Sequence, residues 1–134
     1  MTISYAEAHD LLTALVRART RYDGDGYVAL FADDAEVVLD PFAPALAGHN
    51  ALRAYLNDAA ETERYYDLAI ERHWVAGDTV LAAWHASWNL RADEAAKVRQ
   101  AGFLAADVGG DGRITRLKHW TVTREHSAGQ EGAR

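Results

Sequence analysis

The feature that most constrains the fold is a strict alternation of side chains over residues 80–91. The apolar residues of one face are Val80, Ala82, Trp84, Ala86, Trp88 and Leu90. Successive side chains of a β-strand point to opposite faces of its sheet, so a period of two predicts a strand with one buried face. Because alanines separate the two tryptophans, this face is either packed core or the wall of a cavity.

Three further strands are expected around this segment, over residues 65–75, 97–108 and 113–124. The connections contain glycine and aspartate, at residues 76–79 and again at residues 109–112. The second half of the chain therefore predicts an antiparallel meander. Gly102, in the middle of one strand, indicates a bulge or a bend.

The chain begins with a predicted helix over residues 5–21. Ser4 and Glu7 match a capping box, and apolar residues recur behind them at helical spacing. Arg17, Arg19 and Arg21 end the helix, where cations favour the negative end of the helix dipole. We interpret all three arginines as solvated.

A short strand over residues 36–39 and a helix from residue 48 to about residue 62 complete the pattern. Helices followed by a run of strands are typical of an α+β domain, with helices covering one face of a curved sheet. Such a sheet forms a cone whose open end suits a small molecule. We expect one domain, residues 1–126, and a disordered polar tail, residues 127–134.

The composition excludes several classes of function. The 134 residues contain no cysteine, which excludes disulfides and thiolate chemistry. No apolar run reaches the roughly 18 residues that a membrane span needs. A net charge of −6 without a basic block argues against nucleic acid binding. Because a signal-peptide pattern is also missing, we expect a cytoplasmic protein.

Asp40 is the first candidate for chemistry. It follows the short strand and precedes Pro41, so it is expected at the rim of the predicted pocket. Apolar surroundings raise the proton affinity of a carboxylate, which suits a general base. The alternative is that Asp40 only initiates the turn before Pro41.

His119 is the second candidate. It shares a strand face with Leu117, and near neutral pH an imidazole can donate a hydrogen bond or relay a proton. The alternative is a hydrogen-bonded core histidine. The apolar and aromatic residues expected to bind a substrate near these two groups are Leu15, Phe42, Tyr55, Trp84, Trp88, Leu104 and Leu117.

Two other surfaces carry candidate roles, one for a metal ion and one for dimerisation. His73 and His85 could lie near each other across a hairpin, with Glu71 as a third metal ligand, but this spacing is no strong metal signature and we expect no metal site. The outer sheet face is apolar enough to predict a homodimer. The residues that carry this expectation are His85, Ala101, Phe103 and Ala105.

Two motifs resemble the NTF2-like superfamily, which includes ketosteroid isomerases and SnoaL-type polyketide cyclases. The first is FADDA at residues 31–35, followed by Asp40-Pro41-Phe42 and then Gly48; the second is GDGRI at residues 110–114, followed by His119-Trp120. The resemblance implies an NTF2-like cone, with a curved mixed or antiparallel sheet wrapped around N-terminal helices. It also implies that Asp40 is a base that moves protons. The oxyanion-hole positions of ketosteroid isomerase fall near Leu15 and Leu104, neither of which donates a hydrogen bond.

These observations predict a cofactor-independent acid–base enzyme, such as an isomerase, cyclase or dehydratase, acting on a small apolar oxygenated molecule. The alternative is a non-catalytic NTF2-like module that binds a small ligand or forms dimers. A limonene-type epoxide hydrolase has the same fold but needs an Asp-Arg-Asp set. Arg99 has Ala101 where such a set requires a carboxylate, so this activity ranks below the other two.

Overall fold

The computed structural model describes residues 2–126. The predicted polar tail, residues 127–134, lies outside the described residues. Three helices and six strands follow one another as α1 (Tyr5–Thr20), α2 (Gly24–Val28), β1 (Phe31–Val38), β2 (Leu46–Ala47), α3 (Gly48–Thr62), β3 (Glu63–Ala76), β4 (Thr79–Leu90), β5 (Lys97–Val108) and β6 (Ile114–His126). None of the helices in the described part of the chain is long and apolar enough to cross a membrane.

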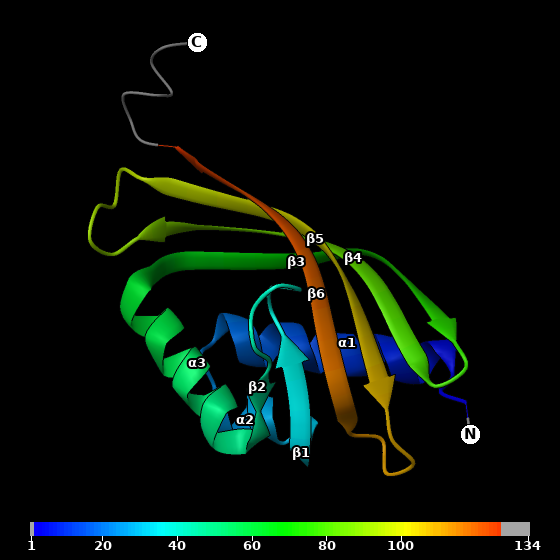
Figure 1. The fold of residues 1–134 in the computed structure, drawn as a ribbon. Helices are drawn as coiled ribbons and strands as arrows, with labels where there is room; N and C mark the ends of the chain where they lie inside the picture. Colours follow the sequence, from blue (N-terminus) through cyan, green and yellow to red (C-terminus); the bar gives the residue numbers. More distant parts are fainter. Residues whose placement is uncertain (1, 127–134) are drawn as a thin grey trace.

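The six strands form one mixed sheet in the order β2-β1-β6-β5-β4-β3. Only the β1–β6 pair is parallel, and the long strands β3 to β6 form the predicted antiparallel meander. Figure 1 shows this sheet curving over α1, with α3 beside its open end. The predicted α+β architecture, a curved mixed sheet around N-terminal helices, is therefore confirmed.

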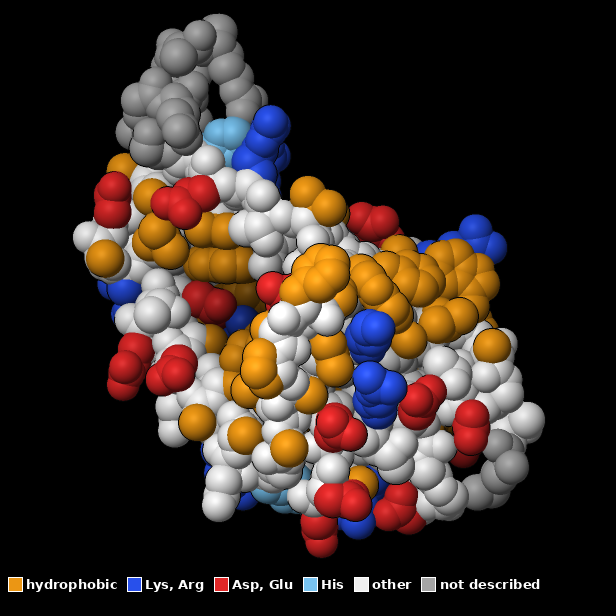
Figure 2. All heavy atoms as spheres, viewed as in Figure 1, with side chains coloured by type: hydrophobic (Ala, Val, Ile, Leu, Met, Phe, Trp, Pro, Cys, Tyr) orange, Lys and Arg blue, Asp and Glu red, His pale blue; other side chains and the backbone are white. Residues whose placement is uncertain are grey.

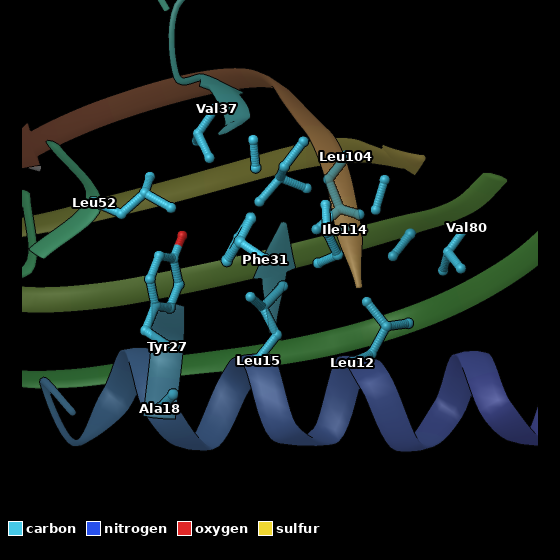
Figure 3. Close-up of a cluster of buried hydrophobic side chains, with 14 of the residues drawn as sticks. Leu12, Leu15, Ala18, Tyr27, Phe31, Val37, Leu52, Val80, Leu104 and Ile114 are labelled. Carbon is cyan, nitrogen blue, oxygen red and sulfur yellow. The ribbon is translucent and has the colours of Figure 1, made fainter. Parts of the chain in front are cut away.

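The hydrophobic core lies between α1 and the concave face of the sheet. Leu12 and Leu15 of α1 point toward Leu104 and Ile114 on the strands, as Figure 3 shows. The helix starts where the sequence predicts: the Ser4 hydroxyl accepts from the Glu7 backbone N–H, and the Glu7 carboxylate accepts from the Ser4 N–H, both at 3.0 Å. These two bonds satisfy N–H groups that have no partner within the helix.

The first strand begins earlier than predicted. Its first residue is Phe31, not residue 36, and the short helix before it ends at Val28. Phe31 pairs in parallel with Ile114, whose N–H donates to the carbonyl of Leu30 at 2.8 Å. This pairing joins segments distant in sequence, which a local pattern does not reveal. The two-residue strand β2 was not predicted.

Gly102 makes no bulge. The register between β4 and β5 is continuous through its pair with Trp84, which contradicts the bulge of the two predicted alternatives. Register shifts occur elsewhere in the sheet, including two in β3, between Arg64 and Asp67 and between Ile70 and Arg72. The first of these shifts contributes to the cavity described below.

Candidate functional site

A cavity of about 260 Å³ lies between α1 and the concave sheet face. Its walls come from α1, α2, α3 and all four long strands, and one of its lining residues, Thr121, is exposed. Figure 2 shows the molecule hollowed where hydrophobic side chains gather between the sheet and the helices. The predicted site residues that line the cavity are Leu15, Tyr55, Trp84, Trp88, Leu104, Leu117 and His119.

Asp40 and Phe42 do not line this cavity. The Asp40 carboxylate is exposed and accepts a hydrogen bond from the Phe42 backbone N–H at 2.9 Å, and the Phe42 side chain is 98% exposed. Leu39 is the last residue of this segment to reach the cavity. The predicted position of Asp40 in apolar surroundings is therefore wrong, because the Asp-Pro turn directs its carboxylate to its own backbone.

Arg19 enters the cavity from α1. Its Nη2 donates to Glu63 Oε2 at 2.9 Å, and the two side chains are only 8% and 10% exposed. Its Nε donates to the Tyr55 hydroxyl at 3.3 Å, and its guanidinium carbon lies 4.0 Å from the centre of the Tyr66 ring. The interpretation of Arg19 as a solvated helix-end cation is wrong.

The sequence did contain a signal for this placement. Arg19 follows Leu15 by four residues and Leu12 by seven, so all three lie on one face of the helix. Burial alone lowers the pKa of Arg19, but the neighbouring Tyr55, Glu63 and Tyr66 outweigh this effect and raise it above its ordinary value. The guanidinium therefore stays charged inside the molecule.

Two unusual backbone conformations support this cluster. Tyr22 has a φ of 54°, just past the end of α1, and its hydroxyl donates to Glu63 Oε1 at 3.2 Å. Tyr65 has a φ of 59° and lies within the first register shift of β3. That shift brings Tyr66, the next residue, beneath Arg19. Residues other than glycine rarely adopt such φ values, so both tyrosines carry strain.

His119 lies on the sheet side of the cavity. It pairs with Leu104 across the strands, and its ring meets the Trp84 indole edge-on, with 5.5 Å between ring centres. Burial, aided by the positive charge of Arg19, lowers the pKa of His119 to about 4. The imidazole is therefore neutral near pH 7, with one nitrogen that donates and one that accepts.

Gly102 determines where the Trp84 indole lies. A Cβ atom at residue 102 would lie 2.5 Å from Cζ2 and 2.6 Å from Cε2 of Trp84. The missing side chain therefore lets the indole lie across β5 toward His119. A close approach to a strand glycine is the alternative to a bulge, and the structure has the close approach.

Three buried polar atoms in residues 2–126 have no hydrogen-bond partner, namely Arg19 Nη1, Trp84 Nε1 and His119 Nδ1. All three belong to side chains that line the same cavity. An unsatisfied buried donor or acceptor costs about 1–3 kcal/mol, so native proteins keep few of them. Their convergence indicates a site prepared for polar atoms of a bound molecule.

Comparison with known proteins identifies the family. The family model of the SnoaL-like domain matches residues 12–117, which is most of the chain. The chain belongs to the SnoaL-like domain family. No curated protein matches the sequence.

Solved structures agree with the NTF2-like fold of this SnoaL-like domain. An NTF2-like protein from Burkholderia xenovorans LB400 has 22% identity and a TM-score of 0.70, covering 89% of this chain and 92% of that one. A Mycobacterium tuberculosis protein in complex with estradiol-17beta-hemisuccinate has 16% identity and a TM-score of 0.73, covering 87% and 98%. An LEH-like epoxide hydrolase from M. tuberculosis has 20% identity and a TM-score of 0.73, covering 87% and 84%. The fold thus occurs in proteins that bind ligands and in enzymes.

His73 and His85, the histidines with metal-binding potential, are not among the residues that line this cavity. His85 Nδ1 lies 2.9 Å from Glu71 Oε1 on exposed side chains, whereas His73 stacks on Tyr5 with 4.0 Å between ring centres. Within residues 2–126, the SnoaL-like domain contains no group of three side chains placed to hold a metal ion.

Proposed function

We propose that this SnoaL-like domain binds a small, largely apolar, oxygen-bearing molecule in the cavity between α1 and the sheet. The observation that carries the proposal is the convergence of three unpartnered polar atoms, from Arg19, Trp84 and His119, on that cavity. An oxygen atom of a ligand can accept from the first two groups. The neutral imidazole of His119 can donate to an oxygen or accept from a hydroxyl group.

The rest of the cavity suits an apolar skeleton. Apolar and aromatic side chains supply most of its walls, including Leu15, Trp84, Trp88, Leu104 and Leu117. Pockets for small molecules typically combine such walls with a few placed polar groups, and they begin at about 300 Å³. The cavity, at about 260 Å³, favours a compact ligand. The estradiol derivative bound by the M. tuberculosis neighbour supports an apolar ligand class.

Acid–base catalysis is the second candidate, and His119 is the observation that favours it. A neutral imidazole in a site with little water can hydrogen-bond to a carbonyl oxygen and stabilise the charge that develops there. Glu63 is the one carboxylate among the cavity-lining residues, and both of its oxygens are engaged, by Arg19 and by Tyr22. Asp40 lies outside the cavity and Arg99 is exposed. The geometry therefore supports binding better than proton abstraction.

Tryptophan fluorescence gives a direct test of binding. The four tryptophans divide into two that line the cavity, Trp84 and Trp88, and two that are partly exposed elsewhere, Trp74 and Trp120. A double variant, Trp74→Phe with Trp120→Phe, leaves only the cavity pair as reporters. We expect saturable quenching by β-tetralone, a neutral bicyclic ketone, in this variant. Leu104→Trp, which fills the cavity, should abolish it.

The binding proposal is refuted if the folded double variant shows neither saturable quenching nor calorimetric heat with a panel of neutral ketones and alcohols of similar size. Catalysis is tested separately, by NMR detection of deuterium exchange next to the carbonyl of β-tetralone. Exchange above the buffer rate that disappears in His119→Gln supports the enzyme. Binding without exchange refutes catalysis of that kind.

A further inference from the structure

The cluster around Arg19 has a chemistry of its own, distinct from that of the His119 side of the cavity. The guanidinium uses Nη2 for Glu63 and Nε for Tyr55, which leaves Nη1 without a partner. Its side chain is more than nine-tenths buried, and it lines the cavity. The free N–H groups of Nη1 therefore require an acceptor that the chain does not supply.

The charge of this cluster is already balanced. Glu63 Oε2 lies 2.9 Å from Arg19 Nη2, and its other oxygen accepts from Tyr22, so one cation faces one anion. Burial raises the pKa of Tyr66 above its ordinary value, so its hydroxyl is uncharged near neutral pH. His119, across the cavity, is neutral as well.

We propose that this cluster, Arg19 with Glu63 and its tyrosine neighbours, is a subsite for an uncharged oxygen acceptor, a carbonyl or ether oxygen, and that it discriminates against carboxylates. The inference rests on the proposed binding of an apolar molecule in the cavity and adds which oxygen chemistry the protein selects. An uncharged oxygen satisfies Nη1 at no electrostatic cost. It leaves the Arg19–Glu63 pair intact.

A carboxylate would meet a different environment. Its charge would approach Nη1 while Glu63 holds Nη2 of the same guanidinium, so attraction to Arg19 would be offset by repulsion from the carboxylate that Arg19 already holds. It would also lose its hydration among apolar walls. Arg17 and Arg21, the nearest arginines along α1, are exposed and not among the residues that line the cavity.

Three compounds with one bicyclic skeleton test the proposal on the intact wild-type protein: tetralin, β-tetralone and tetralin carboxylate. Isothermal titration calorimetry at pH 7 measures each dissociation constant. Hydrogen bonds to charged groups are worth about 1.5–3 kcal/mol, so we expect the ketone to bind about 10- to 100-fold more tightly than the hydrocarbon. The carboxylate should bind more weakly than the ketone.

The variant Arg19→Lys assigns the preference to Nη1. Lysine keeps the positive charge opposite Glu63, but it lacks the planar fork that presents a second nitrogen to the cavity. The ketone-to-hydrocarbon ratio should fall at least about fivefold in Arg19→Lys and stay unchanged in Arg17→Lys, an exposed site on the same helix. Circular dichroism verifies that both variants fold.

The outcomes separate the two proposals. Equal affinity for ketone and hydrocarbon, or tighter binding of the carboxylate than of the ketone, overturns the subsite while the cavity remains a binding site. An unchanged ratio in Arg19→Lys also overturns it. If none of the three compounds binds, the proposed function fails and the subsite fails with it.

Discussion

Gly102→Ala tests whether the cavity wall depends on a residue without a side chain. The new methyl group would lie 2.5 Å from Cζ2 and 2.6 Å from Cε2 of Trp84, and 2.9 Å from the backbone oxygen of Trp120. Carbon atoms in contact prefer separations of about 3.5–4.0 Å. The indole therefore has to move, and with it the edge-on contact to His119.

The expected loss of stability can be worked out from opposing terms. Overpacking a core typically costs about 1–3 kcal/mol, whereas replacing a strand glycine by alanine gains about 0.5–1 kcal/mol. The midpoints of these two ranges give a net loss of about 1 kcal/mol. An unfolding entropy of about 2.1 cal/mol/K per residue, over 134 residues, converts this loss into a fall in Tm of about 4 °C.

A double-mutant cycle measures the cause. In a Trp84→Phe background, the atoms that the new methyl group would strike are gone, so Gly102→Ala should cost at least about 0.5 kcal/mol less than in the wild type. Trp88→Phe serves as the matched control, because Trp88 also lines the cavity but pairs with Val98 rather than Gly102. An alanine variant as stable as the wild type, or equal costs in both backgrounds, would refute this account of Gly102.

The buried ion pair, the cavity histidine, the turn aspartate and the outer sheet face each permit a direct test. Arg19→Met or Glu63→Gln alone should lower the free energy of unfolding by about 3–5 kcal/mol in urea titrations, because each leaves a buried group unpaired. The double variant should lose less than the sum of the two single losses. The pKa of His119, lowered from 6.5 to about 4, means that the native state binds fewer protons than the unfolded chain between these values. Stability should therefore fall by at most about 3 kcal/mol as the pH drops from 6.5 to about 4, and His119→Gln should flatten that slope. Asp40→Asn should leave ligand affinity unchanged and Tm within about 2 °C of the wild type, since asparagine also accepts the turn hydrogen bond. Loss of binding or turnover in this variant would show that Asp40 is part of the functional site. Val122 is 76% exposed and pairs across the strands with Ala101, a residue of the surface predicted to dimerise. Val122→Glu should therefore convert a dimer to a monomer in sedimentation velocity; a monomeric wild type contradicts that prediction.

The fold was largely predictable because its strongest signals are local. Period-two alternation and glycine turns define β4 and its neighbours, and a capping box begins α1. The start of β1 was missed for a physical reason. Phe31 joins a strand because it pairs with Ile114, and no pattern around Phe31 contains that information.

The walls of the cavity were predictable, whereas its polar groups were not. Alternation along the strands indicated which face carries Trp84 and His119, and that face lines the cavity. Arg19 was missed because charged residues at a helix end are usually solvated. Its burial depends on the ion pair with Glu63, the first residue of β3, which offsets the loss of hydration. Asp40 was misplaced because the sequence permits two surroundings for its carboxylate, the rim of the apolar pocket and the turn before Pro41. The turn prevails in the structure, since the Phe42 N–H is adjacent in sequence.

Several features of the Arg19 cluster cost free energy of folding, and these costs favour a ligand-binding role over a purely structural one. A buried arginine–glutamate pair is no efficient source of stability, because well-packed apolar residues often do as well or better. Tyr22, which holds Glu63, and Tyr65, which precedes Tyr66, both have positive φ values, and such strain costs about 1–3 kcal/mol per residue. These costs, together with the unpartnered Nη1, fall on the Arg19 cluster or on residues adjoining it, and Arg19, Glu63 and Tyr66 line the cavity. A chain that needed only a filled interior could lower its free energy by replacing this cluster with leucine and phenylalanine. A bound molecule that accepts a hydrogen bond from Nη1 explains why the Arg19 cluster is retained.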